Sequence, residues 1–102
     1  MSRSDSPLGQ AWHQHAEGQN QNAVDQFAKI TQQSPEDMDA LYGLGLAQRG
    51  AGQTAEALAT FQRVKALVEA AVPESEEATN RLEMLSRMVN QQIRFLEGGE
   101  QA

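Results

Sequence analysis

The sequence contains no cysteine, which excludes disulfide bonds and thiolate metal sites. Aromatic residues are scarce too, with one tryptophan, one tyrosine and three phenylalanines among 102 residues. Alanine, glutamine and glutamate are abundant instead, and these residues favour helices and have little preference for strands. The composition therefore argues against an all-β sandwich, and the length allows one hydrophobic core rather than two.

Positive charge and long apolar runs are also lacking. Eight lysines and arginines stand against 14 acidic residues, which gives a formal net charge of −6. A protein that binds a nucleic acid duplex must neutralise several phosphates, so nucleic acid and anionic membranes are poor candidate partners. No stretch approaches the roughly 20 apolar residues of a membrane span, and residues 1–7 lack the apolar run of a signal peptide. We therefore expect a cytoplasmic protein that binds neither nucleic acid nor membrane.

The chain repeats itself at an offset of 34 residues. A glycine, an alanine, a phenylalanine and a branched aliphatic residue recur in the same order and spacing. They are Gly18, Ala23, Phe27 and Ile30 in the first copy, and Gly52, Ala57, Phe61 and Val64 in the second. The apolar residues of each copy recur at helical spacing on both sides of the glycine, so each copy is predicted to be a helix, a tight turn and a helix.

The start of the second copy carries a helix-capping pattern. Ser34 is predicted to cap the helix, Pro35 suits its first position, and Asp37 follows at the spacing of a capping box. The pair Ser6-Pro7 makes a similar start for the first copy. Because Ser6-Pro7 lies later in the repeat register, the first helix is expected to be short.

Residues 73–97 form a different kind of element, a single long helix after an acidic start. It carries an apolar stripe, and Gly98-Gly99 is expected to end it. In one interpretation this helix seals the apolar face of the last repeat. In the other, its far end overhangs and binds a partner or a second copy through Ile93, Phe95 and Leu96. Since stable arrays generally need about three or more repeats, self-association would supply missing buried surface.

The 34-residue unit resembles the tetratricopeptide repeat, and the resemblance covers roughly residues 7–72. It implies an all-α, helix-turn-helix repeat array, an α-solenoid of about five helices. Small residues at Gly45 and Ala57 would let paired helices approach closely, with Phe61 filling the gap. We expect a flexible N-terminus at 1–6, two helical hairpins at 7–72, a capping helix at 73–97 and a flexible tail at 98–102.

The resemblance also implies a binding surface. In the family, the first helix of each repeat lines a concave face that holds an extended peptide or a partner's helix. The corresponding positions here are Leu8, Trp12, His15, Asp39, Tyr42, Gly43, Leu46 and Arg49. They lack the basic clamp with which chaperone-binding relatives hold a C-terminal carboxylate. An apolar and aromatic strip remains, although Trp12 could instead pack against Phe27.

Residue patterns for catalysis are weak throughout the sequence. His13 and His15 are two residues apart, so on a helix they point in different directions and cannot form a zinc-binding pair. The glycines around residues 43–52 lack the lysine of a phosphate-binding loop. We expect no catalytic residue, metal or cofactor, and a small non-enzymatic adaptor or scaffold that binds a protein or peptide. The alternatives are a structural protein that assembles into a homo-oligomer through its C-terminal helix and, as the weakest, an enzyme or small-ligand carrier.

Overall fold

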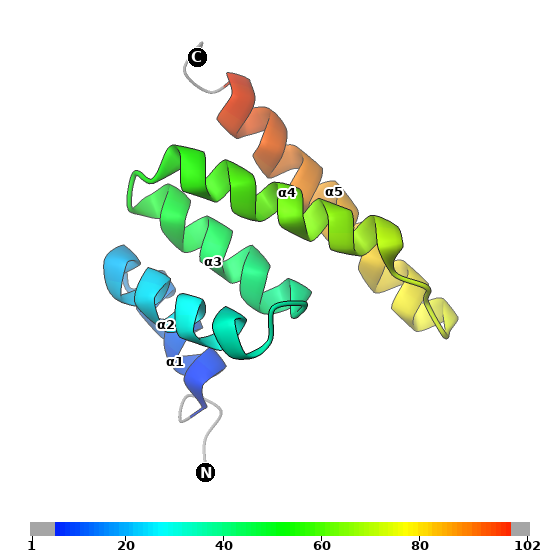
Figure 1. Ribbon diagram of the computed structural model, residues 1–102, viewed down its shortest axis with the longest axis horizontal. Coiled ribbons are helices and arrows are strands. Elements are labelled where there is room, and N and C mark those ends of the chain that lie inside the picture. The colour runs from blue at the N-terminus through cyan, green and yellow to red at the C-terminus, as the bar shows by residue number, and fades with distance from the viewer. Residues whose placement is uncertain (1–5, 99–102) are drawn as a thin grey trace.

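A computed structural model describes residues 6–98, and within that range it contains five α-helices and no strand. The helices are α1 (Pro7–Ala16), α2 (Asn20–Gln33), α3 (Met38–Gly50), α4 (Thr54–Ala70) and α5 (Glu76–Gly98) (Figure 1). The predicted all-α array of about five helices is therefore confirmed. The flexible ends that we expected fall largely on residues 1–5 and 99–102, which lie outside the described residues.

The sequence repeat is reproduced in the backbone of the two turns. Gly18 and Gly52 adopt φ angles of +79° and +80°, a left-handed conformation that glycine reaches without strain. The N–H of Gly18 donates to the carbonyl of His15 at 3.1 Å, and the N–H of Gly52 donates to the carbonyl of Arg49 at 3.1 Å. The α1–α2 and α3–α4 hairpins therefore turn in the same way.

The first helix starts as predicted. The Oγ atom of Ser6 accepts a hydrogen bond from the N–H of Gly9 at 2.9 Å, and Pro7 occupies the first helical position. With 10 residues, α1 is shorter than α3, which has 13.

The predicted start of α3 is wrong by one turn. Ser34 is the C-cap of α2, and its carbonyl accepts a hydrogen bond from the N–H of Asp37 at 3.1 Å. Residues 34–37 therefore form a turn with Pro35 at its second position, where the fixed φ of proline is favoured. Asp37 caps α3 instead, because its Oδ1 accepts from the N–H of Ala40 at 3.1 Å.

The core is built where glycines let helices approach. Phe27, Phe61, Val64 and Val89 are the largest fully buried side chains. A Cβ atom at Gly45 would lie 2.6 Å from the ring of Phe61, so the ring fills space that any side chain at this position would take. This contact between α3 and α4 confirms the expectation that Gly45 lets the two helices approach closely and that Phe61 fills the gap.

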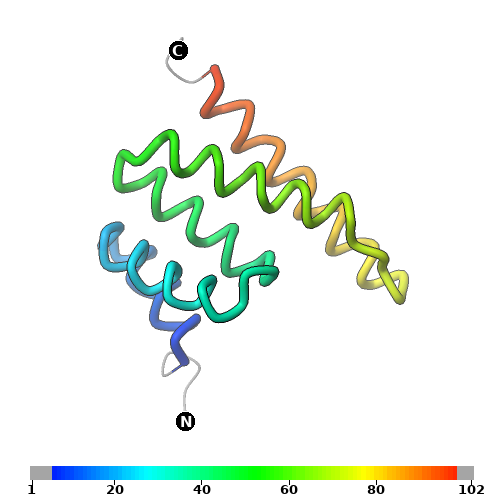
Figure 2. The backbone as a smooth tube through the Cα atoms, viewed as in Figure 1, coloured from blue at the N-terminus to red at the C-terminus, as the bar shows by residue number. Residues whose placement is uncertain are grey.

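Helix α5 packs along α4 and covers its apolar face. Val89 and Ile93 are buried, and Leu96 is half-buried against the same core. Of the three residues predicted for self-association, Ile93 and Leu96 pack against the core and Phe95 is 52% exposed. Their role in self-association stays a prediction. The opposite ends of α4 and α5 extend beyond the start of α3, as Figure 2 shows.

The side of α5 that faces away from the core is polar. Exposed residues there include Glu83, Arg87, Gln91 and Arg94. Such a polar outer face is typical of a helix that caps a repeat array. The interpretation in which this helix seals the last repeat agrees with its packing.

Candidate functional site

A groove of about 1060 Å³ lies on the face formed by α1, α3 and α5. Its apolar lining comes from all three helices and from the loop between α4 and α5. The apolar side chains are Leu8, Trp12, Met38, Tyr42, Leu46, Ala71, Val72, Pro73, Ala78, Leu82, Met84, Leu85 and Met88.

The groove exists because the spacing between α3 and α5 is wider than the spacing between α3 and α1. Helices α1 and α3 pack directly, with Trp12 and Phe27 both against the bare backbone of Gly43. Helices α3 and α5 meet near their C-terminal ends, where Nη1 of Arg49 donates to Oε1 of Gln92 at 2.7 Å. The guanidinium of Arg49 also lies 3.9 Å from the ring centre of Phe95. These contacts close one end of the groove and leave the other end open.

The aromatic residues of the groove are anchored in the core. Tyr42 is 8% exposed, and its ring centre lies 5.5 Å from that of Phe61. Trp12 is half-buried and packs edge-on against Phe27, with ring centres 5.1 Å apart. Trp12 therefore both packs on Phe27 and lines the groove. The core contacts of Trp12 and Tyr42 hold the groove wall in place at these two side chains.

Helix α5 supplies the second wall, which the sequence analysis did not assign to the groove. Leu82, Leu85 and Met88 are half-buried there, and Met84 is 51% exposed. The stripe that these residues form was visible in the sequence. The periodicity of the stripe indicates that α5 has an apolar face. It does not show that α4 covers only part of this face and leaves the rest to line the groove.

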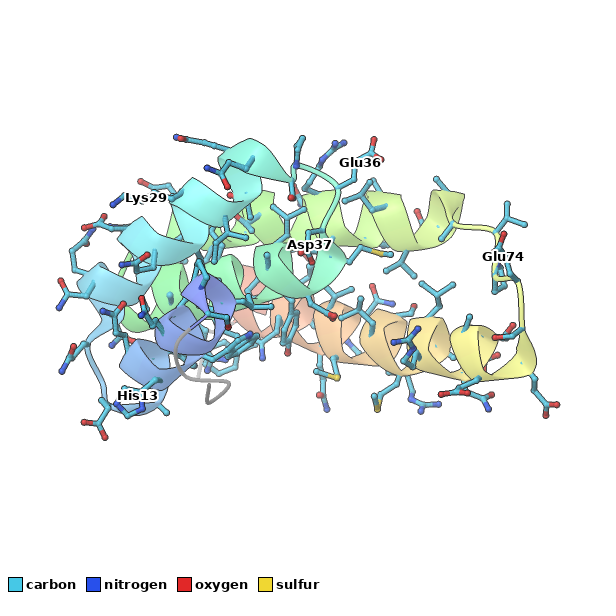
Figure 3. All side chains as sticks on the ribbon, turned by 90° about the horizontal axis from the view of Figure 1, so that it is seen from below. His13, Lys29, Glu36, Asp37 and Glu74 are labelled. Carbon is cyan, nitrogen blue, oxygen red and sulfur yellow. The ribbon has the colours of Figure 1, made fainter. Side chains whose placement is uncertain are left out.

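The open end of the groove is acidic. Asp37 lies at the start of α3 and Glu74 in the loop before α5 (Figure 3). Asp39 lies in the first turn of α3. Asp37 is engaged as the N-cap of α3, whereas Asp39 and Glu74 are exposed. Arg81, on the α5 wall, is the basic residue among those that line the groove.

Five of the eight residues predicted for the concave face line this groove. They are Leu8, Trp12, Asp39, Tyr42 and Leu46. Their role in binding a partner stays a prediction.

The other three predicted residues lie outside the groove lining. Gly43 is buried beneath it, because a side chain there would overlap Phe27 and Trp12. Arg49 spans to α5 at the closed end. His15 lies edge-on to Trp12 at 6.0 Å, and its buried Nδ1 atom has no hydrogen-bond partner among the described residues.

Residues 6–98 hold no group of three or more histidine, aspartate or glutamate side chains placed to bind a metal ion. Within these residues, no helix combines the length and the apolar character needed to cross a bilayer.

Comparison with known proteins gives one match. The model of the tetratricopeptide repeat matches residues 14–75, which is more than half of the chain. Neither the curated proteins nor the solved structures provide a match. The matched segment contains both glycine turns and ends at Ser75, the residue before α5.

Proposed function

Because this chain belongs to the tetratricopeptide repeat family, whose repeats generally mediate protein–protein interaction, we propose that it is a small non-enzymatic adaptor. Its groove holds a helix or a peptide segment of another protein. The observation that carries this proposal is the apolar groove of about 1060 Å³ between α3 and α5.

The side chains of the groove are of the types that supply binding energy. Tryptophan and tyrosine are enriched at binding hot spots, and Trp12 and Tyr42 are held by core contacts before any partner arrives. Little side-chain entropy is then lost on binding at these two positions. Leu46 and Leu85 add half-buried apolar surface on opposite walls. A few apolar anchors of a partner, inserted between these walls, would account for affinity and orientation.

The α5 wall is the adaptable side of the groove. Met84 and Met88 have flexible, polarisable side chains that adjust to ligands of different shape. The acidic open end adds a charge preference, since Asp39 and Glu74 favour a partner with basic residues at that end. We therefore propose a partner segment with an apolar stripe and adjacent positive charge.

The proposal is tested by substitution of the half-buried wall residues. Leu46→Glu with Met88→Glu places two carboxylates in the groove without removing a fully buried side chain. Truncation of Trp12 or Tyr42 would be less informative, because both also pack in the core. The matched control is Ala59→Glu with Ala66→Glu, at two exposed positions of α4.

The readout is affinity capture from a lysate of the source organism, followed by calorimetry with the purified partner. We expect that the unmodified chain and the control both enrich one protein, and that the groove variant does not. In calorimetry, the Kd of the groove variant for that protein should be about tenfold or more higher. Circular dichroism should show the same helicity for all three chains. A captured protein that binds the groove variant as tightly as the control would place binding elsewhere and contradict the proposal.

A further inference from the structure

A ridge and a groove lie side by side on α5. Met84 and Met88 line the large groove and also a second hollow of about 410 Å³ on the outer side of the same helix. The two methionines therefore form a ridge between the two hollows, and Met84 is 51% exposed at its crest. We call Met84 and Met88 the methionine ridge. A surface that carries both a ridge and a groove can be complementary to itself.

The charges around these features are unevenly distributed. The open end of the groove carries the exposed carboxylates of Asp39 and Glu74. The hollow beyond the methionine ridge is lined by the exposed side chains of Arg87 and Arg94. Acidic groups therefore outnumber Arg81 where the groove lies toward the N-terminal ends of α3 and α5, and Arg87 and Arg94 outnumber Glu97 in the C-terminal half of α5.

We propose that a second copy of this chain occupies the groove, so that the methionine ridge of each copy sits in the groove of the other about a twofold axis. Under a twofold axis perpendicular to α5, the two α5 helices run antiparallel. The C-terminal half of one α5 then lies over the open end of the partner copy's groove. Arg94 of one copy meets Asp39 and Glu74 of the other, and the same contact recurs on the other side of the axis.

This inference goes beyond the proposed function and does not rest on it, because it follows from the shape and charge of one face alone. If both hold, the dimer covers the groove and a partner segment must displace the second copy. Binding of a partner would then convert dimers into monomers, and the concentration of the chain would regulate access to the groove.

Sedimentation velocity of the full chain, from low micromolar to millimolar concentration, tests the dimer. We expect a monomer–dimer equilibrium that Asp39→Lys and Arg94→Glu each weaken by about tenfold or more, because each change reverses charge at both symmetric contacts. Mixing the two variants should restore the dimer. In the mixed pair, the side chains introduced by Asp39→Lys and Arg94→Glu face each other on one side of the axis, and the native Asp39 and Arg94 face each other on the other side.

The matched controls are Glu36→Lys and Lys29→Glu, which make the same charge changes at exposed positions away from α5 (Figure 3). They should leave the dimer unchanged, alone or mixed. A chain that stays monomeric at all concentrations overturns the inference, as does a dimer that neither Asp39→Lys nor Arg94→Glu weakens. A mixture of these two variants that stays monomeric also overturns it.

The two proposals fail in different ways. A monomeric chain whose groove still captures a partner leaves the adaptor function standing and removes the dimer. If the charge-reversal variants change the dimer as expected but the chain captures no partner through its groove, the adaptor function is contradicted and the dimer is supported.

Discussion

At the scale of single residues, the fold depends on rings packed against bare backbone. Phe61 lies over Gly45, and Phe27 lies over Gly43, so each aromatic ring occupies the space of an absent side chain on α3. Phe27 and Phe61 are both completely buried and cannot move aside without opening the core. The distance between α3 and its two neighbours is set by these contacts.

Gly45→Ala should therefore destabilise the protein, although alanine is the better helix former. The added Cβ would lie 2.6 Å from the ring of Phe61, and overpacking of this kind costs about 1–3 kcal/mol. Over most of that range the cost exceeds the roughly 1 kcal/mol that alanine gains over glycine in a helix. Urea unfolding followed by circular dichroism measures the difference. Gly98→Ala is the control, because a Cβ there meets nothing within 4 Å; equal stability of both variants would contradict this account.

The residue-level predictions from the sequence differ in quality for a physical reason. The contact of Gly45 with Phe61 was implied by the resemblance to the tetratricopeptide repeat, and both residues belong to one hairpin. Gly43 was assigned to the concave face because the resemblance to the tetratricopeptide repeat places it there. Its burial depends on Trp12 and Phe27, which come from two other helices, and the spacing within α3 does not contain that information.

At the scale of elements, the helix starts are set by three side-chain caps. Ser6, Asp37 and Ser75 accept hydrogen bonds from backbone N–H groups three residues later, at 2.9 to 3.1 Å. Each cap satisfies a donor that its helix leaves free. Helices α2 and α4 follow the glycine turns without a side-chain cap, so those turns alone direct their entry.

Ser75→Ala should lower the free energy of unfolding by about 1 kcal/mol, because the N–H of Ala78 loses its acceptor at 3.0 Å. Ser34→Ala is the matched control. Ser34 does not cap α3, so its substitution should change stability by less than about 0.5 kcal/mol. Thermal and urea unfolding of both variants provide the measurement. A larger loss for Ser34→Ala than for Ser75→Ala would show that Ser34 caps a helix after all.

The sequence could identify the helices but not choose between competing caps. Ser34 and Asp37 both suit an N-cap, and both are followed by residues that favour a helix. Asp37 is the N-cap of α3 because residues 34–37 form the turn between α2 and α3. That turn depends on how closely the two helices pack.

At the scale of the whole molecule, α5 both seals the core and builds half of the groove. Its buried residues Val89 and Ile93 cover α4, while Leu85 and Met88 face α3 across the groove. Two repeats alone would leave the α4 face open to water, and short arrays of this kind are marginally stable.

Deletion of α5, by ending the chain at Val72, should therefore abolish cooperative folding rather than merely remove one helix. We expect the free energy of unfolding to fall below about 1 kcal/mol, with α4 losing helicity as well. Thermal melts by circular dichroism, normalised per residue, test this outcome. A chain that ends at Gly98 keeps α5 and serves as the control. A sharp melt with unchanged helicity of residues 7–70 in the shorter chain would contradict the prediction.

The architecture was therefore predictable, and the groove only in part. The resemblance to the tetratricopeptide repeat implied the first-helix positions, and Leu8, Trp12, Asp39, Tyr42 and Leu46 do line the groove. The wall from α5 was not predicted, because it depends on the spacing between α3 and α5. That spacing is a property of helix packing across the whole chain, and no local pattern records it.

The position of Trp12 makes the protein its own spectroscopic sensor. It is the single tryptophan of the chain, and its indole ring touches the core on one side and lines the groove on the other. Fluorescence excited at the indole band therefore comes from one known place. Unfolding would expose the ring to water and shift its emission to the red, whereas an occupant of the groove would shield it and shift the emission to the blue. Both equilibria can be followed in one cuvette without a label.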